Sequence, residues 1–269
     1  MTAQPPRKLD TRGLGPIAVV RARIIERRIA ARNNRARRTL ESMTGLWREI
    51  MDYSKGSEVT GASYSDYLTL HEEIRRRKPR EILEFGTGLS TVVLAHALKA
   101  NMAEGAPPGR ITSMEESAEW HATAVGILPP QYTDVVEILH SPKVDGIYKL
   151  FRGVQYEEIP DRPYDFVFSD GPERHSLVNG DKLFDLDLIQ IVRRSETPVH
   201  AVVDNHYLTF YVLQKVFGKK LARYSPVHRL MFVGPVTRHD VRHLRKENFV
   251  PDLRLTGSTE FKLRMALDD

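Results

Sequence analysis

Residues 81–91 join an apolar run to a Gly-x-Gly turn, and the turn leads directly into an amphipathic helical pattern. The segment reads Glu-Ile-Leu-Glu-Phe-Gly-Thr-Gly-Leu-Ser-Thr. Glycine lets the chain turn tightly and lets a ligand approach main-chain atoms that a side chain would shield. Ligands of open α/β sheets bind at the carboxyl ends of the strands, where such a turn lies. The segment therefore predicts a strand, a ligand-binding turn with Gly86 and Gly88, and a helix that Ser90 or Thr91 caps.

Apolar runs suited to strands continue along the chain, with helical patterns between them. The expected strands are residues 81–85, 111–114, 135–139, 166–168, 201–203, 221–224 and 229–233, and the expected helices are 90–100, 118–127, 182–192 and 208–217. Such alternation implies right-handed crossovers and a sheet that is covered on both faces. We predict an α/β fold, a Rossmann-like three-layer αβα sandwich with a seven-stranded, mainly parallel sheet whose last strand is antiparallel.

A helical region precedes this sheet. Residues 17–51 place apolar side chains near one stripe and arginines over most of the remainder. Ser63 with Asp66 fits a capping box at the start of a second helix, which Lys78 before Pro79 ends. We expect a flexible lead at 1–16, a basic helical extension at 17–55, the sheet domain at 56–240, and a C-terminal tail at 241–269 to which no structure is assigned.

Charge is distributed unevenly along the chain. Residues 1–40 hold 11 Lys and Arg against 2 acidic residues, a net charge of +9, whereas the remaining residues have a net charge of −4. This asymmetry argues against a nucleic-acid-binding surface over the whole protein. The absence of cysteine excludes disulfides and thiolate sites. No apolar run approaches the ~20 residues of a membrane span and no signal peptide is recognisable, so we expect a cytoplasmic protein.

Three roles are open for the basic stretch at residues 17–40. It packs against the core or a partner subunit with its arginines solvated, or docks on RNA, or adsorbs on an anionic membrane surface. Residues 1–40 contain no aromatic side chain that could stack on bases, which weakens the RNA alternative.

The turn at residues 86–88 must also be compared with a dinucleotide-binding fingerprint. That fingerprint has a third glycine, and Thr91 stands in its place here. Glu84, two residues before the first glycine, favours a ligand with a cationic end rather than a pyrophosphate. A structural turn without a ligand is the remaining alternative.

Three segments in order resemble class I S-adenosylmethionine-dependent methyltransferases. The first is Glu-Phe-Gly-Thr-Gly-Leu-Ser at 84–90, the second Ile-Thr-Ser-Met-Glu-Glu-Ser-Ala-Glu-Trp at 111–120, and the third Tyr-Asp-Phe-Val-Phe-Ser-Asp-Gly-Pro at 164–172. The resemblance spans roughly residues 60 to 235 and implies that S-adenosylmethionine is the cofactor. It places Glu84, Gly86, Thr87, Gly88 and Ser90 around the methionine end.

Glu115 is expected to hold the ribose. A carboxylate at a strand end accepts two hydrogen bonds from a vicinal diol, as in dinucleotide sites. Glu116 is the adjacent competitor, and an ordinary exposed acid is the alternative to either role.

The acceptor would meet the methyl group beyond the fourth and fifth parallel strands. Methyl transfer from a sulfonium is an in-line displacement that needs alignment of the acceptor and removal of its proton. Asp170, His175 and His206 are the candidate catalytic residues, and Asp170 is also a candidate contact of the cofactor.

A metal is a further hypothesis. Asp170, Asp204 and Asn205 offer three oxygen ligands that suit Mg²⁺ or Ca²⁺, and catechol-type O-methyltransferases resemble this arrangement. Gly171-Pro172 departs from the usual residues after the aspartate, and no catalytic lysine is evident. In the alternative, Asp170 caps a turn and Asp204 orders a loop.

The resulting prediction is O-methylation of a small molecule with S-adenosylmethionine as donor. One alternative is an RNA or protein methyltransferase that docks through the basic helix, although no Asn-Pro-Pro-Tyr-like motif follows the fourth strand. The other is a non-catalytic member of the fold that binds a nucleoside.

Overall fold

The computed structural model of the chain describes residues 15–56, 63–242 and 244. The expected lead at 1–16 and tail at 241–269 lie almost wholly outside these residues. The described helices are α1 (Pro16–Ser42), α2 (Thr44–Gly56), α3 (Tyr64–Arg77), α4 (Leu89–Ala103), α5 (Ala118–Ile127), α6 (Asp187–Arg194) and α7 (Tyr207–Phe217), with 3₁₀ turns at Pro130–Tyr132 and Arg238–Asp240. Within the described residues, no helix is both long and apolar enough to cross a membrane.

A seven-stranded sheet forms the centre of the domain. Its strands are β1 (Glu81–Phe85), β2 (Arg110–Glu115), β3 (Val136–His140), β6 (Phe166–Ser169), β8 (Val199–Val203), β9 (Ala222–Ser225) and β10 (Leu230–Val236). The order is β3-β2-β1-β6-β8-β10-β9. The first five strands pair in parallel, and β10 is antiparallel to both of its neighbours. This confirms the predicted fold class.

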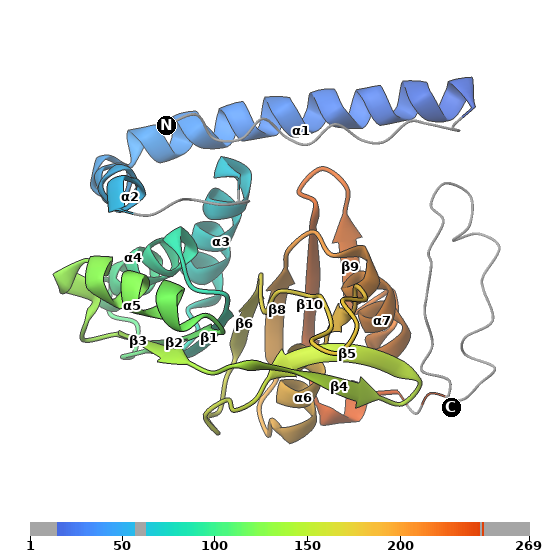
Figure 1. The fold of residues 1–269 in the computed structure, drawn as a ribbon. Coiled ribbons are helices and arrows are strands. Elements are labelled where there is room, and N and C mark those ends of the chain that lie inside the picture. The colour runs from blue at the N-terminus through green and yellow to red at the C-terminus, as the bar shows by residue number, and fades with distance from the viewer. Residues whose placement is uncertain (1–14, 57–62, 243, 245–269) are drawn as a thin grey trace.

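Two helical layers cover the sheet (Figure 1). Ile82 and Phe166 point to the face covered by α3 and α4, whereas Leu83 and Val167 point to the face covered by α6 and α7. Because neighbouring residues of a strand alternate between faces and both faces are buried, the strands are nearly continuous apolar runs. The sheet is the middle of three layers.

The carboxyl ends of the parallel strands meet at one edge. Phe85 of β1 is in register with Met114 of β2 and with Ser169 of β6, and Ser169 is in register with Val203 of β8. The chain leaves β1 and β6 towards opposite faces, so the switch point of the sheet lies between these strands. Open α/β sheets bind their ligands in the crevice at such a switch point.

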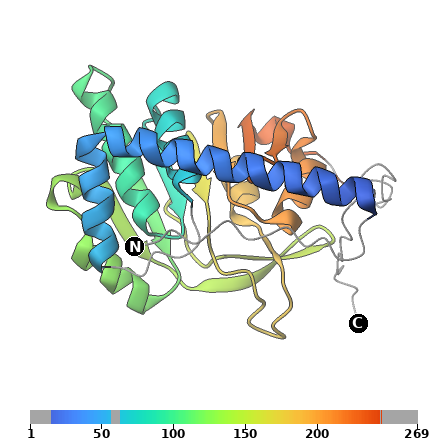
Figure 2. The ribbon, with the colours of Figure 1, turned by 90° about the horizontal axis from the view of Figure 1, so that it is seen from above.

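The basic N-terminal region is two helices, not one continuous helix over 17–51. The first helix ends at Met43, which has a φ of −85° and a ψ of 72°. The break lets Leu46 and Ile50 of α2 turn into the core beside α4. Figure 2 shows α1 running across the top of the domain.

The predicted boundaries of α3 are confirmed, since the Ser63 amide donates to Asp66 Oδ2 at 2.8 Å and Lys78 ends the helix with a φ of 51°.

A second, three-stranded sheet was not predicted. It consists of β4 (Lys143–Tyr148), β5 (Phe151–Tyr156) and β7 (Phe184–Asp185) in that order. The helix expected at 182–192 is therefore wrong in its first part: α6 begins only at Asp187. The carboxylate of Asp187 accepts hydrogen bonds from the Tyr156 amide at 3.2 Å. Pairing with a distant strand outweighs the local helical pattern here.

Candidate functional site

The two glycines of the turn between β1 and α4 have different structural roles. Gly86 has a φ of +88°, in the left-handed region that favours glycine, and a Cβ there would lie 3.2 Å from the backbone nitrogen of Gly171. Gly88 has an extended φ of 169°, and a Cβ there would meet no heavy atom within 4 Å. The fold therefore requires glycine at 86, whereas glycine at 88 leaves the space in front of the turn open.

The start of α4 is tied to Glu84. Neither Ser90 nor Thr91 is the N-cap residue, because α4 begins at Leu89 with Gly88 as its N-cap. Thr91, the third residue of the helix, accepts a hydrogen bond from the Gly88 amide at 3.1 Å and donates to Glu84 Oε2 at 2.6 Å. In place of the expected cap, the side chain of the third helical residue accepts a hydrogen bond from the amide of the N-cap residue. Through Thr91 the turn is held to the Glu84 carboxylate.

Glu84 is a buried acid with one oxygen unused. Its residue is 0% exposed, and burial raises the pKa of its carboxyl to about 7, although the hydroxyls of Ser113, Ser90 and Thr91 oppose the shift. Ser113 donates to Oε2 at 2.7 Å, while Oε1 has no hydrogen-bond partner among the described residues. A buried polar atom without a partner is costly. A cationic group near the turn would stabilise the ionised form of this carboxyl.

A cavity of about 420 Å³ lies in front of the turn. Six of the seven predicted cofactor-binding residues line it, and the seventh, Glu84, lies beneath the turn. These six are Gly86, Thr87, Gly88, Ser90, Glu115 and Asp170. The structure thus brings together residues from the ends of β1, β2 and β6. The volume lies within the range of small-molecule sites.

The structure separates the roles of Glu115 and Glu116, although both line the cavity. The Ser117 amide donates to Oε1 of Glu115 at 3.0 Å, and burial raises the pKa of the Glu115 carboxyl. Both oxygens of Glu116 accept from the backbone amide of Glu173, each at 2.9 Å. Glu116 therefore anchors the loop after β6, and Glu115 is the acid better placed to bind a ligand.

Three aromatic side chains of the cavity were not predicted as site residues. Tyr53 of α2 and Tyr67 of α3 come from elements that precede the sheet, and Trp120 belongs to α5. Burial raises the pKa of the Tyr53 hydroxyl, and the charges of Glu84 and Glu115 add to this effect. Trp120 lines the cavity while remaining 43% exposed. Only its position five residues after Glu115 hinted at such a role, and nothing local signals the two tyrosines.

Acidic residues from the ends of β6 and β8 lie together beside the cavity. Ligand atoms of Asp170, Asp204 and His206 all lie within 4.8 Å of one another. Burial, and then the charge of Asp204, raises the pKa of Asp170 well above its usual range. Two carboxyls this close disfavour each other's ionised form.

His206 is engaged by a neighbouring arginine. Nη1 of Arg174 lies 2.9 Å from Nδ1 of His206. A guanidinium can only donate, so Nδ1 accepts and the imidazole hydrogen is on Nε2. Burial and the Arg174 charge lower the pKa of His206 to about 2, which keeps the ring neutral. A neutral imidazole has one lone pair, so His206 in this arrangement can neither bind a metal nor accept a substrate proton.

The predicted metal ligands Asp170, Asp204 and Asn205 are oxygen donors of the kind that Mg²⁺ prefers, and a metal at this site stays a prediction. Asp170 and Asp204 are suitable oxygen ligands, and Asn205 Oδ1 is buried with no hydrogen-bond partner in the described part of the chain. Arg174 lines the same cavity as Asp170.

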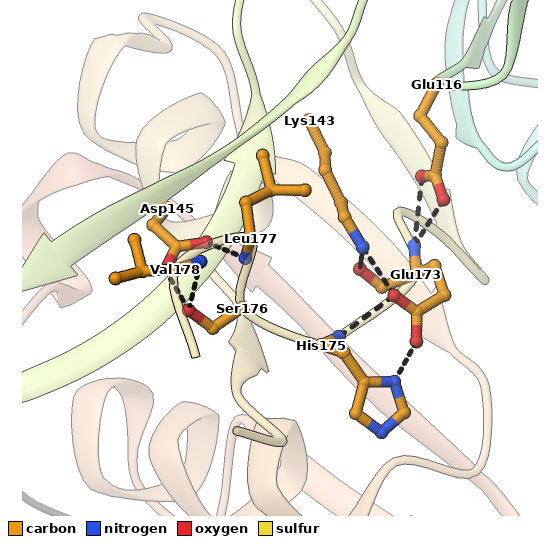
Figure 3. A network of polar contacts seen from close by, with 8 residues as sticks. All are labelled: Glu116, Lys143, Asp145, Glu173, His175, Ser176, Leu177 and Val178. Atoms are coloured by element: carbon orange, nitrogen blue, oxygen red, sulfur yellow. Dashed lines mark hydrogen bonds and ion pairs between the residues drawn. The ribbon is translucent and has the colours of Figure 1, made fainter. Parts of the chain in front are cut away.

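His175 lies outside the cavity lining. Its side chain is 58% exposed, and its Nδ1 bonds to Glu173 Oε1. Figure 3 shows Glu173 at the centre of a polar network that also includes Lys143 of β4 and Glu116. The Lys143 ammonium donates to the Glu173 carbonyl oxygen at 2.9 Å. His175 is thus placed as a partner of an exposed carboxylate, outside the cavity that Asp170 lines.

Comparisons with known proteins give likenesses of structure only. No protein-family model matches the chain, and no curated protein matches it. An O-methyltransferase of Bacillus cereus in complex with SAH is 18% identical, over 69% of this chain and 74% of that one, with a TM-score of 0.41. The O-methyltransferase TomG of Streptomyces achromogenes in complex with SAM is 21% identical, over 68% and 73%, with a TM-score of 0.38.

A methyltransferase-like protein of Silicibacter pomeroyi is 17% identical, over 65% of this chain and 87% of that one, with a TM-score of 0.42. TM-scores this low carry no weight for the activity. The fold assignment rests on the strand order and pairing described above.

Proposed function

We propose that this protein is an S-adenosylmethionine-dependent methyltransferase. The observation that carries the proposal is the open backbone at Gly88, which faces a cavity that also has the Glu115 carboxylate on its wall. No neighbouring atom requires glycine there, so the missing side chain is best explained by a ligand that lies across the turn. The unpaired Oε1 of Glu84 supports a ligand with a cationic end.

The cavity can accommodate the parts of the donor in a definite order. The methionine end would lie over the turn at residues 86–90, with its ammonium group towards Glu84. Glu115 would accept hydrogen bonds from the two ribose hydroxyls. Trp120, an exposed ring on the same wall, offers a flat apolar surface for the adenine. These placements agree with the resemblance of the three sequence motifs.

We propose an oxygen atom of a small molecule as the methyl acceptor. In the transfer, the acceptor oxygen forms a bond to the methyl carbon while the carbon–sulfur bond breaks, and the acceptor proton must leave. Asp170 is the candidate general base, because it lines the cavity in which the acceptor would meet the methyl group. Arg174 lies on the same wall and would stabilise negative charge on the oxygen.

Other parts of the sequence-based prediction stay proposals. A Mg²⁺ ion held by Asp170, Asp204 and Asn205 would polarise an acceptor hydroxyl. His175 and His206 are weaker candidates for the base than Asp170, for the reasons of position and tautomer given above. A cytoplasmic location, and docking of residues 17–40 on RNA or an anionic membrane, also stay proposals.

Calorimetric titration of the full chain with S-adenosylhomocysteine tests the proposal. We expect one site per chain, followed by turnover of S-adenosylmethionine with members of a panel of phenolic and catecholic acceptors. Absence of both heat and thermal stabilisation with either adenosyl compound, in a sample that melts cooperatively, would refute the proposed cofactor. Binding without turnover on any acceptor would favour a non-catalytic, nucleoside-binding role.

A further inference from the structure

We propose that α1 lies with its outer side on an anionic lipid surface, with aliphatic side chains among the lipids and arginines against the headgroups. The outer side carries two rows of side chains that follow one another along the helix. The aliphatic row is Ile17, Val20 and Ile24, and the arginine row is Arg28, Arg35 and Arg38. The inference goes beyond the proposed function and does not depend on it, because its test measures binding to vesicles and needs no cofactor.

The opposite side of α1 attaches the helix to the domain. Ala36 and Leu40 are buried in the core that α1 shares with α3 and α4, and Arg32 Nε donates to the Ser65 hydroxyl of α3 at 2.9 Å. Because an α-helix turns once in 3.6 residues, the two rows point away from Ala36 and Leu40. In Figure 2, α1 lies in front of the described elements that it crosses, so its outer side is open to a partner.

The aliphatic row is an apolar surface of unusual continuity. Each of its members leaves at least 46% of its surface exposed. Of the nine large apolar side chains that are exposed in the described part of the chain, three lie in this row. Spacings of three and four residues place them on adjacent turns of one helix. Single exposed apolar side chains are usual, whereas a contiguous group indicates an interaction surface.

Positive charge surrounds and extends the aliphatic row. All three members of the arginine row are exposed, as are Arg21 and Arg27, which flank the aliphatic row on either side. The acidic residues of α1 lie elsewhere, since Glu26 is on the opposite side of the helix and Glu41 pairs with Arg37 at 2.8 Å. Long arginine side chains can lie along an apolar surface and keep their charge in the headgroup region. The partner that complements this side of α1 is therefore anionic.

A lipid surface fits this combination better than RNA or a second copy of the chain. RNA phosphates would pair with the arginines, but the aliphatic row would stay exposed, and α1 has no aromatic side chain to stack on bases. A second copy seated face to face would bring arginine against arginine, which is unfavourable. Anionic lipids accept both components, because aliphatic side chains enter the interface while basic side chains bind the headgroups.

Co-sedimentation of the full-length chain with vesicles tests the proposal. Vesicles of phosphatidylcholine are compared with vesicles that also contain phosphatidylserine, at low and at physiological salt. We expect roughly tenfold tighter binding to the anionic vesicles than to the neutral ones, and salt should weaken this binding. The variant Arg28→Gln/Arg35→Gln/Arg38→Gln should bind the anionic vesicles about tenfold more weakly than the wild type.

A second variant and a matched control separate insertion from charge attraction. Ile17→Ser/Val20→Ser/Ile24→Ser keeps every arginine and should lower the affinity for anionic vesicles severalfold. The control removes three exposed aliphatic side chains from other parts of the surface and should bind like the wild type; it is Ile147→Ser/Leu177→Ser/Val178→Ser. All of these substitutions concern exposed side chains, so each variant is expected to melt like the wild type.

Several results would overturn the inference. Equal binding to neutral and anionic vesicles, or binding to neither, contradicts the role of the arginines. An aliphatic-row variant that binds like the wild type, or a control that loses as much, contradicts insertion of this row. Binding to an RNA oligonucleotide but not to vesicles would indicate RNA docking instead, and a dimer that only the aliphatic-row variant dissociates, without vesicle binding, would indicate a second copy. A wild type that binds vesicles but no S-adenosylhomocysteine would count against the proposed function alone.

Discussion

The substitution Gly88→Ala tests whether position 88 needs glycine for ligand binding rather than for folding. A Cβ at position 88 meets nothing within 4 Å, and the backbone there is extended. Removing glycine at such a position stabilises by roughly 0.4–1 kcal/mol through the unfolded state, and alanine at an N-cap costs a similar amount. We therefore expect a net change in the free energy of unfolding below about 1 kcal/mol.

The effect on the ligand should be larger. Overpacking by a methyl group costs roughly 1–3 kcal/mol when the neighbouring atoms cannot retreat. Since 1.4 kcal/mol corresponds to a tenfold change in affinity, Gly88→Ala should weaken S-adenosylhomocysteine binding roughly 5- to 150-fold. Calorimetric titration measures this loss, and urea unfolding of the same sample measures the stability.

The matched control is Gly86→Ala, two residues away in the same turn. Its φ of +88° and the 3.2 Å approach of Gly171 to the Cβ position make the change a folding defect. We expect it to lower the free energy of unfolding by roughly 2–5 kcal/mol. Unchanged ligand affinity in Gly88→Ala would refute the reasoning, because the methyl group would then occupy space that no ligand uses.

Three further predictions concern the rest of the site and the N-terminal helix. The carboxyl of Glu84, whose pKa burial raises to about 7, is stabilised in its protonated form, so the wild type should lose stability relative to Glu84→Gln as pH rises from about 5 to 8. The loss in the free energy of unfolding amounts to roughly 3 kcal/mol at most, and urea titrations at several pH values measure it. A stability difference between the wild type and Glu84→Gln that does not vary with pH would contradict the prediction. Glu115→Gln should weaken S-adenosylhomocysteine binding about 10- to 100-fold through loss of charge-assisted hydrogen bonds, whereas Glu116→Gln should have a smaller effect, and calorimetry on both variants decides. The exposed side chains of Ile17, Val20 and Ile24, at 74%, 56% and 46% exposure, should help to retain the chain on anionic vesicles in sedimentation assays, and salt should weaken the part of this retention that the arginines of the helix contribute. Replacing all three by serine should reduce the retention on vesicles severalfold. Equal retention of the wild type and the triple variant would leave only the arginines to explain binding.

Local sequence patterns determined a large part of this protein. The central strands and most helices lie within a few residues of their predicted positions, because each is an apolar run or a helical period bounded by glycine or proline. The order of strands and helices implied a parallel sheet, and a parallel sheet places the residues after each strand at one edge. The sequence alone therefore assigns Glu115 and Asp170 to one site.

Contacts between distant segments decided what the sequence left open. The β4-β5-β7 sheet depends on pairing across some thirty residues, and it converts the start of a predicted helix into a strand. Tyr53 and Tyr67 line the cavity only because α2 and α3 pack beside α4. The raised pKa of Asp170 likewise follows from burial and from the charge of Asp204, which the fold brings beside it from another strand. Hydrophobic period and turn propensity act between neighbours along the chain, whereas charge, tautomer and cavity shape are set by atoms that only the tertiary fold brings together.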